Sequence, residues 1–136
     1  MPTLLETASI LDKMLKEGWQ DQTPIAVDNI PYEDVQGTPY LSTQFIPYNT
    51  NNEVLGSHLT CKRKRTTGVL SILIRTPFES GIGLAYTYSE NIGEIMDNKN
   101  PVCDLFTLAS ATRRVGDSGD GWFNLMCDVP FVSDNT

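Results

Sequence analysis

Residues 68–77 combine two apolar patterns that together describe a central β-strand. One set of apolar side chains recurs at every second position and two more lie between them, so both faces of an extended segment carry apolar groups. The first set is Leu70, Ile72 and Ile74, and the second is Val69 and Leu73. Pro77 has no backbone N–H to give to a neighbouring strand. We therefore predict a strand that is covered at least partly on both faces and that ends at Pro77.

Helical spacing begins directly after this strand. Ser80 is a candidate N-cap, because its hydroxyl can accept a hydrogen bond from a backbone N–H of the first helical turn. Apolar residues then recur every three or four positions, at Leu84, Tyr88, Ile92 and Ile95. The pattern predicts a helix at about residues 80–97.

A second helix is predicted at about residues 3–17. Thr3 and Glu6 have the spacing of a capping box, in which each side chain pairs with a backbone N–H at the start of a helix. The apolar stripe consists of Leu4, Ala8, Leu11 and Leu15. Gly18 is expected to end this helix as its C-cap.

The remaining patterns predict strands joined by turns. The clearest is residues 122–132, because alternate positions are all apolar: Phe123, Leu125, Cys127, Val129 and Phe131. Shorter candidates are residues 23–27, 39–46 (closed by Pro47), 102–108 and 110–115. Loops are expected at 28–38 and 116–121, and a frayed terminus at 133–136. The fold class that follows is α+β, with a mixed or antiparallel sheet of about four to six strands packed against two main helices.

Residues 48–67 are the most polar part of the chain. They begin with an asparagine-rich run, and four consecutive basic residues stand near their end, before Thr66 and Thr67. A connection of this length between two strands is uncommon in a compact domain and is usually functional or disordered. We interpret it as a long hairpin arm or a mobile loop.

Composition limits the classes of protein to which the chain can belong. Its 136 residues, 40% of them hydrophobic and 20% charged, suit a single globular domain over residues 1–136. The net charge of −7 argues against a surface built wholly to bind nucleic acid. No apolar run approaches the ~20 residues of a membrane-spanning helix. Three cysteines without close pairing are typical of a reducing compartment.

Candidates for enzymatic chemistry are weak. Gly81-Ile82-Gly83 follows a strand and opens a helix, as in dinucleotide-binding folds, but Tyr86 stands where the third glycine belongs. His58 and Cys61 have the spacing of half a zinc site, without a second close pair of ligands. The carboxylates at 117–120 lack the spacing of a calcium loop. We therefore predict no enzyme, no metal and no cofactor, with a small nucleotide- or metal-binding enzyme as the rival class.

The candidate site is the basic run Lys62, Arg63, Lys64 and Arg65, which holds four of the ten basic residues of an acidic chain. Such a patch can meet an acidic neighbouring subunit or partner, or can touch DNA phosphates. It can also be a solvated edge that blocks aggregation. Because no aromatic residues are interleaved to stack on bases, protein contact is the preferred interpretation.

The order of these features along most of the chain matches that of a known family. After the first helix, Asp28-Asn29-Ile30-Pro31-Tyr32 leads to Gly37-Thr38-Pro39-Tyr40-Leu41, and Arg63-Lys64-Arg65 with Gly68 enters a strand. Pro77 with Gly81 and Gly83 precedes the long helix, and Gly121-Trp122-Phe123 through Pro130-Phe131 forms the last strand. This arrangement resembles the tail terminator proteins of long-tailed bacteriophages, which are related to the U protein of lambda-like phages. The asparagine-rich residues 49–53 and the cysteines depart from that pattern.

The resemblance implies a small α+β protein that assembles as a ring, usually a hexamer, on the finished tail tube. Its partners would be further copies of itself, the tail tube protein and a head-completion or connector protein. It would end tube polymerisation and present the head-joining surface at the head-proximal end of the virion tail, after assembly in the host cytoplasm. DNA would pass through without specific binding, and no membrane is implied. Another ring protein of the neck or tube, such as a head–tail connector, is the alternative.

Overall fold

The computed structural model describes residues 4–20, 22–26, 39–54, 62–77, 81–102, 104–115 and 122–135, with side chains described except at 49–54, 62–64, 81, 82 and 135. The elements in chain order are α1 (Leu4–Trp19), β1 (Ile25–Ala26), β2 (Tyr40–Val54), β3 (Lys62–Pro77), α2 (Gly81–Met96), β4 (Leu105–Thr107), β5 (Ala111–Val115) and β6 (Trp122–Asn135). The predicted Ser80 cap, the loop at 28–38 and the turn at 116–121 lie outside the described residues.

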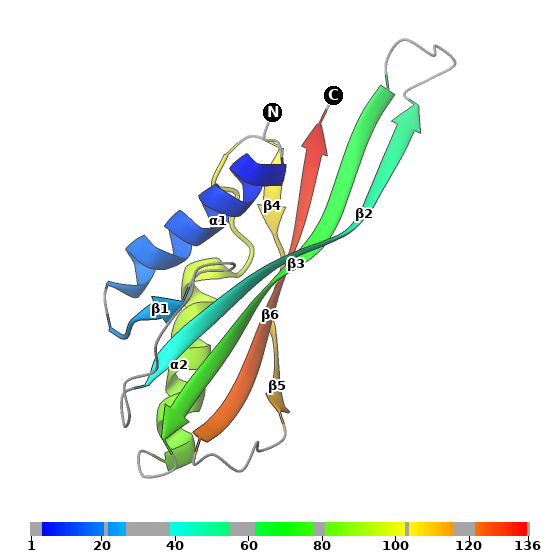
Figure 1. Cartoon of the computed structure of the whole chain (residues 1–136). Helices are drawn as coiled ribbons and strands as arrows, with labels where there is room; N and C mark the ends of the chain where they lie inside the picture. The colour runs from blue at the N-terminus through cyan, green and yellow to red at the C-terminus, as the bar shows by residue number, and fades with distance from the viewer. Residues whose placement is uncertain are drawn as a thin grey trace.

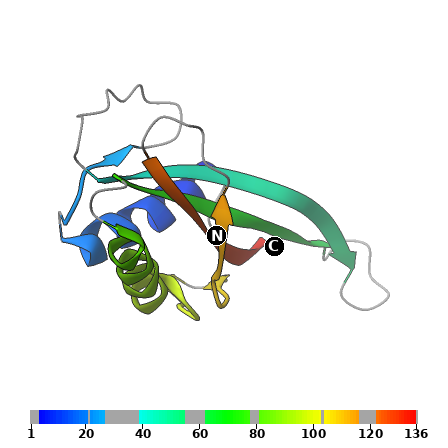
Figure 2. The ribbon, with the colours of Figure 1, turned by 90° about the horizontal axis from the view of Figure 1, so that it is seen from below.

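The strands form one mixed, open sheet. Its order is β1-β2-β3-β6-β4, and β5 also pairs with β6. β1 runs parallel to β2, and the other pairs are antiparallel. Both helices lie on the same side of the sheet, which gives two layers (Figure 1; Figure 2). The predicted α+β class, with two main helices against a mixed sheet, is confirmed.

Alternation along β3 and β6 places the core between the sheet and the helices. Ile72 pairs with Thr43 on one side and with Cys127 on the other, and all three side chains are buried. The apolar side chains predicted to share a face of each strand are indeed fully or almost fully buried: Leu70, Ile72, Ile74, Phe123, Leu125, Cys127, Val129 and Phe131. Burial of these groups is the main stabilising contribution to the fold.

Gly18 has a different role from the predicted one. α1 continues through it to Trp19, and Gln20 adopts the left-handed conformation, with φ of 54°, where the helix ends. A Cβ atom at Gly18 would lie 2.6 Å from Cγ2 of Ile95 in α2. The prediction of a C-cap at Gly18 was wrong because the glycine is needed for the close approach of two helices, which sequence spacing does not reveal.

The polar stretch is a hairpin arm, not a loop. The prediction that this strand ends at Pro47 was wrong. β2 continues to Val54, with a register shift between Pro47 and Asn49. A bulge of this kind accommodates a proline, which cannot donate to the ladder. β3 begins at Lys62, so residues 48–54 and 62–67 of the polar stretch both lie in strands. At about 3.3 Å per residue, the 15-residue β2 is about 50 Å long.

The end of the chain is a strand and not the predicted frayed terminus. β6 continues to Asn135, and the side chains of Ser133 and Asp134 are buried. The backbone N–H of Asp134 donates to the carbonyl oxygen of Asp104 at 2.8 Å. The last residues of β6 pair with β3 on one side and hydrogen-bond to Asp104 on the other. They therefore cannot fray independently of their neighbours.

Residues 102–115 were predicted as two strands and form shorter ones. β4 covers only Leu105–Thr107, preceded by an isolated bridge from Val102 to Leu105. β5 covers Ala111–Val115 and pairs with the middle of β6. The first predicted short strand likewise shrinks to β1, two residues long.

Thr107 connects the end of α2 to β4. Its buried hydroxyl donates to the carbonyl oxygen of Met96 and accepts from the backbone N–H of Lys99 at 2.8 Å. Replacing Thr107 with valine keeps the shape but leaves both backbone groups without this partner, so the free energy of unfolding should fall by about 2 kcal/mol. Urea unfolding measures the change. Thr107→Ser is the control, because it keeps the hydroxyl; an equal or larger loss in the serine variant would contradict this role.

Thr76 presents the opposite case. Its hydroxyl is fully buried and has no hydrogen-bond partner among the described residues. Because a buried, unpaired polar group is costly, Thr76→Val should raise the free energy of unfolding by about 1 kcal/mol. The matched control is Thr43→Val, which removes a hydroxyl that donates to the carbonyl oxygen of Ala26 at 3.5 Å and should destabilise. Thermal or urea unfolding measures both variants. If both substitutions stabilise the protein, or both destabilise it, the Thr76 hydroxyl is not the unpaired group described here.

Candidate subunit interface

The predicted site residues lie in the hairpin arm. The arm consists of the ends of β2 and β3 that extend beyond the body of the molecule (Figure 1). The backbone of residues 62–65 pairs with that of residues 51–54 in β2, and residues 64 and 65 also pair with the end of β6. The structure therefore places Lys62, Arg63, Lys64 and Arg65 in one strand at the base and outer part of the arm.

Arg65 is the one member of this run whose side chain is described, and it binds within the chain. Its Nε donates to Oδ1 of Asp134 at 2.7 Å, and its Nη2 donates to Oδ2 at 3.2 Å. This is a two-pronged pair between adjacent strands, in a partly buried setting. Arg65 thus ties the end of β6 to the base of the arm, and a role in contacting a partner stays a prediction.

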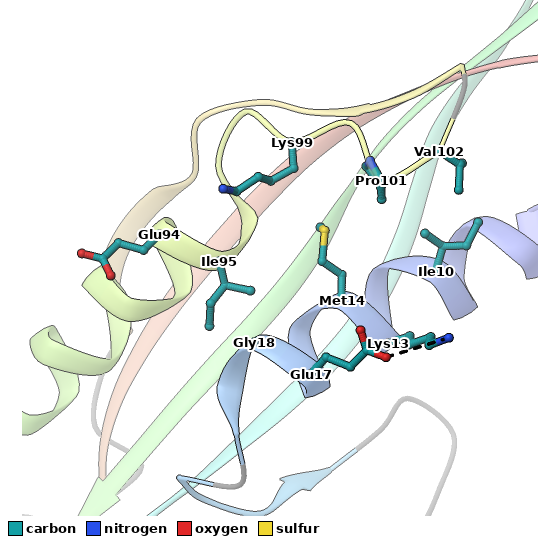
Figure 3. A pocket seen from close by; sticks show the side chains of 10 residues that line it. All are labelled: Ile10, Lys13, Met14, Glu17, Gly18, Glu94, Ile95, Lys99, Pro101 and Val102. Carbon is teal, nitrogen blue, oxygen red and sulfur yellow. Dashed lines mark ion pairs between the residues drawn. The ribbon is translucent and has the colours of Figure 1, made fainter.

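A cleft of about 590 Å³ lies between α1 and α2 (Figure 3). Its apolar lining comes from Ile10, Met14, Ile95, Pro101 and Val102. Charged side chains also line it: Glu94, Lys99, and the exposed ion pair of Lys13 and Glu17 at 3.9 Å. Sequence reasoning did not find this cleft, because its position depends on how the two helices cross.

The outer face of α2 is acidic. Residues 81–98 contain three carboxylates and no lysine or arginine. Asp97 accepts a hydrogen bond from the backbone N–H of Ser110 at 2.8 Å. Glu90 and Glu94 are exposed and form no ion pair with any residue that the structure describes. Sequence reasoning missed this surface, although the absence of basic residues over 18 positions was a signal that could have found it.

The face of the sheet away from the helices carries an ordered arginine. The guanidinium of Arg75 lies over the rings of Tyr40 and Trp122, with its Cζ 5.6 and 5.0 Å from their centroids. It also donates to the hydroxyl of Tyr40 at 2.7 Å and to Oδ1 of Asn124 at 3.0 Å. These contacts join β2, β3 and β6 on that face and rigidify this end of the sheet.

The described residues add no support for a nucleotide site or a metal site. α2 does follow a strand, but β6, which lies beside β3, runs antiparallel to it, so the described strands do not form the βαβ unit of a dinucleotide-binding fold. A Cβ atom at Gly83 would meet nothing within 4 Å among the described residues. His58, Cys61, Cys103 and residues 117–120 lie outside the described residues. Within the described parts of the chain, no group of three or more His, Cys, Asp or Glu side chains is placed to hold a metal ion.

Cys127 is a core residue. Burial raises the pKa of its thiol, and hydrogen bonds with Ser110 and Thr112 lower it by less. The thiol is therefore neutral at pH 7, since its unperturbed pKa is already well above that value. A neutral, fully buried thiol is a poor nucleophile and a poor metal ligand.

Comparison with known proteins identifies the fold. Neither a family model nor a curated protein matches the chain. A chain from the virion of a native gene transfer agent particle superposes with a TM-score of 0.59 at 14% sequence identity, covering 94% of each chain. A second solved chain, whose description names no function, gives a TM-score of 0.59 at 13% identity and covers 92% of this chain and 94% of its own. At these identities the likeness shows a shared fold.

No helix among the described residues is long and apolar enough to cross a membrane.

Proposed function

We propose that this chain is a structural protein of a phage-like virion, and more specifically a tail terminator that caps the tail tube as a ring. The observation that carries the proposal is the fold likeness to a chain of a gene transfer agent virion, which extends over 94% of both chains. The order of sequence features that resembles tail terminators points the same way. Agreement between a whole-chain fold likeness and an independent sequence pattern is stronger than either alone.

The mechanism of the proposed terminator is geometric. Identical subunits joined head to tail close into a ring when the rotation between neighbours is a whole fraction of a turn. One face of that ring would repeat the contacts of a tube subunit, while the other would lack them, so that no further tube ring could add. The head-completion or connector protein would then bind the second face.

The proposal also assigns partners, location and chemistry. The partners are further copies of the chain, the tail tube protein and the head-completion or connector protein, at the head-proximal end of the virion tail. DNA passes through the ring without specific binding, which the net charge of −7 favours because an acidic channel repels phosphates. No enzymatic activity and no cofactor are assigned.

The first test of this function is the assembly state of the purified protein. A ring of six 15.1-kDa subunits has a mass of about 91 kDa, and light scattering coupled to size exclusion would measure it at increasing concentration. Negative-stain microscopy should show rings with six-fold symmetry. A strict monomer that binds a nucleotide or zinc would overturn the proposal and favour the enzymatic alternative.

Another ring protein of the neck or tube is the second candidate, because the fold likeness to a virion chain supports it equally. The two candidates differ in what happens when the chain is removed. Loss of a terminator gives tubes of uncontrolled length, whereas loss of a connector gives tails of normal length that do not join heads. Electron microscopy of particles made without this chain separates these outcomes.

A further inference from the structure

Two glutamates on α2 stand at positions where their charges destabilise the helix. Glu90 and Glu94 are four residues apart, so they are neighbours on the helix surface and repel each other. Both stand in the C-terminal half of α2, where the helix dipole disfavours carboxylates, and the last turn contains no basic residue. Both are exposed and form no ion pair within the described part of the chain. Such local conflicts tend to mark surfaces with a function.

The opposite charge is concentrated on the hairpin arm. Four of the ten basic residues stand at 62–65, and residues 48–67 contain a single carboxylate, Glu53. Outside 62–65 the chain has 17 acidic and six basic residues, a balance of −11. The basic segment and the acidic helix therefore have complementary charges.

The arm and the acidic face are on opposite sides of the molecule. The arm extends from one end of the sheet, while α2 lies under the other end, and two perpendicular views agree (Figure 1; Figure 2). Two complementary surfaces that cannot meet within one molecule can meet between two copies. A contact of this kind is heterologous, and heterologous contacts form rings when they close.

We propose that the basic strand segment 62–65 of one copy docks against Glu90 and Glu94 on α2 of the next copy, and that this contact sets the neighbour-to-neighbour geometry of the ring. The inference rests on the proposed ring function and names the surfaces involved. The two-pronged pair of Arg65 with Asp134 supports it, because it fixes the base of the arm before the neighbour binds. A prepositioned arm loses less conformational entropy on association.

A charge exchange between the two surfaces tests this contact. E90K/E94K and R63E/K64E should each weaken ring assembly about tenfold or more, since each places like charges against each other. Combining all four substitutions restores opposite charges and should recover most of the assembly. Arg65 is left unchanged because it binds Asp134. Light scattering across a concentration series measures assembly, and circular dichroism checks that each variant is folded.

The control is K16E, which changes the net charge by the same amount as K64E alone, lies on the exposed surface of α1 and should assemble like the unchanged protein. Rings that survive both charge reversals, or reversals that the combined variant does not rescue, would overturn this contact while the ring function stands. Loss of duplex-DNA retention by R63E/K64E with intact rings would also overturn it, by assigning the basic segment to DNA. Absence of rings from the unchanged protein would overturn the proposed function as well.

Discussion

Replacing Gly68 with alanine is expected to lower the free energy of unfolding by about 3 kcal/mol. Gly68 lies in β3 between Pro47 of β2 and Phe131 of β6. A Cβ atom there would lie 2.5 Å from the carbonyl oxygen of Ile46, 2.8 Å from Cα of Pro47 and 2.8 Å from Cζ of Phe131. Two of these atoms belong to the backbone, so relief requires the bulged part of β2 to move away from β3. Equilibrium unfolding in urea measures the loss.

The control for Gly68 is Gly83, in the first turn of α2. In the part of the chain that the structure describes, no atom lies within 4 Å of a Cβ placed at Gly83. Gly83→Ala should therefore stabilise the protein by about 0.5–1 kcal/mol, because alanine loses less backbone entropy in a helix. If Gly68→Ala unfolds at the same urea concentration as the unchanged protein, β2 and β3 do not approach each other as closely at the bulge as described.

Replacing Trp19 with alanine is expected to lower the free energy of unfolding by about 3–5 kcal/mol. Trp19 is fully buried at the end of α1 and meets the ring of Tyr88 in α2 edge-on, with 5.2 Å between centroids. Its Nε1 donates to the hydroxyl of Thr23 at 3.1 Å. The indole therefore joins α1, the connection to β1 and α2, and its removal leaves a large cavity where they meet.

Trp19→Phe separates the two contributions. Phenylalanine keeps an aromatic ring against Tyr88 but cannot donate to Thr23, so it should cost about 1–2 kcal/mol plus the smaller loss of volume. Thermal unfolding of both variants gives the comparison. A Trp19→Ala variant as stable as the unchanged protein would show that the helices are not held together at this point.

Strand alternation and helical spacing predicted the two long helices and the core faces of β3 and β6, because those patterns depend only on local periodicity. The errors arose where tertiary contacts override local signals. Pro47 is tolerated because β2 bulges beside it. Gly18 lies inside α1 because its missing side chain leaves room for Ile95 of α2. The last residues of β6 are ordered by β3, which lies more than 60 residues away in the chain.

The candidate interface could be predicted in part. The basic run at 62–65 is visible in the sequence as a charge asymmetry, and the hairpin arm was one of two interpretations of the polar stretch. The partner of Arg65 could not be predicted, because Asp134 is 69 residues away and becomes a neighbour only through strand pairing. The acidic character of α2 is visible in the sequence, because residues 81–98 contain no lysine or arginine, but the exposure of Glu90 and Glu94 is known only from the structure.

Termination of a growing tail tube is the central claim, and its most direct measurement is the length of tubes polymerised with and without this chain. Tail-tube subunits from the same particle would be polymerised, and the tubes imaged by electron microscopy. The proposal predicts shorter tubes with a ring of this protein on one end, and no further growth from that end when more subunits are added. Tubes of unchanged length with bare ends would contradict it.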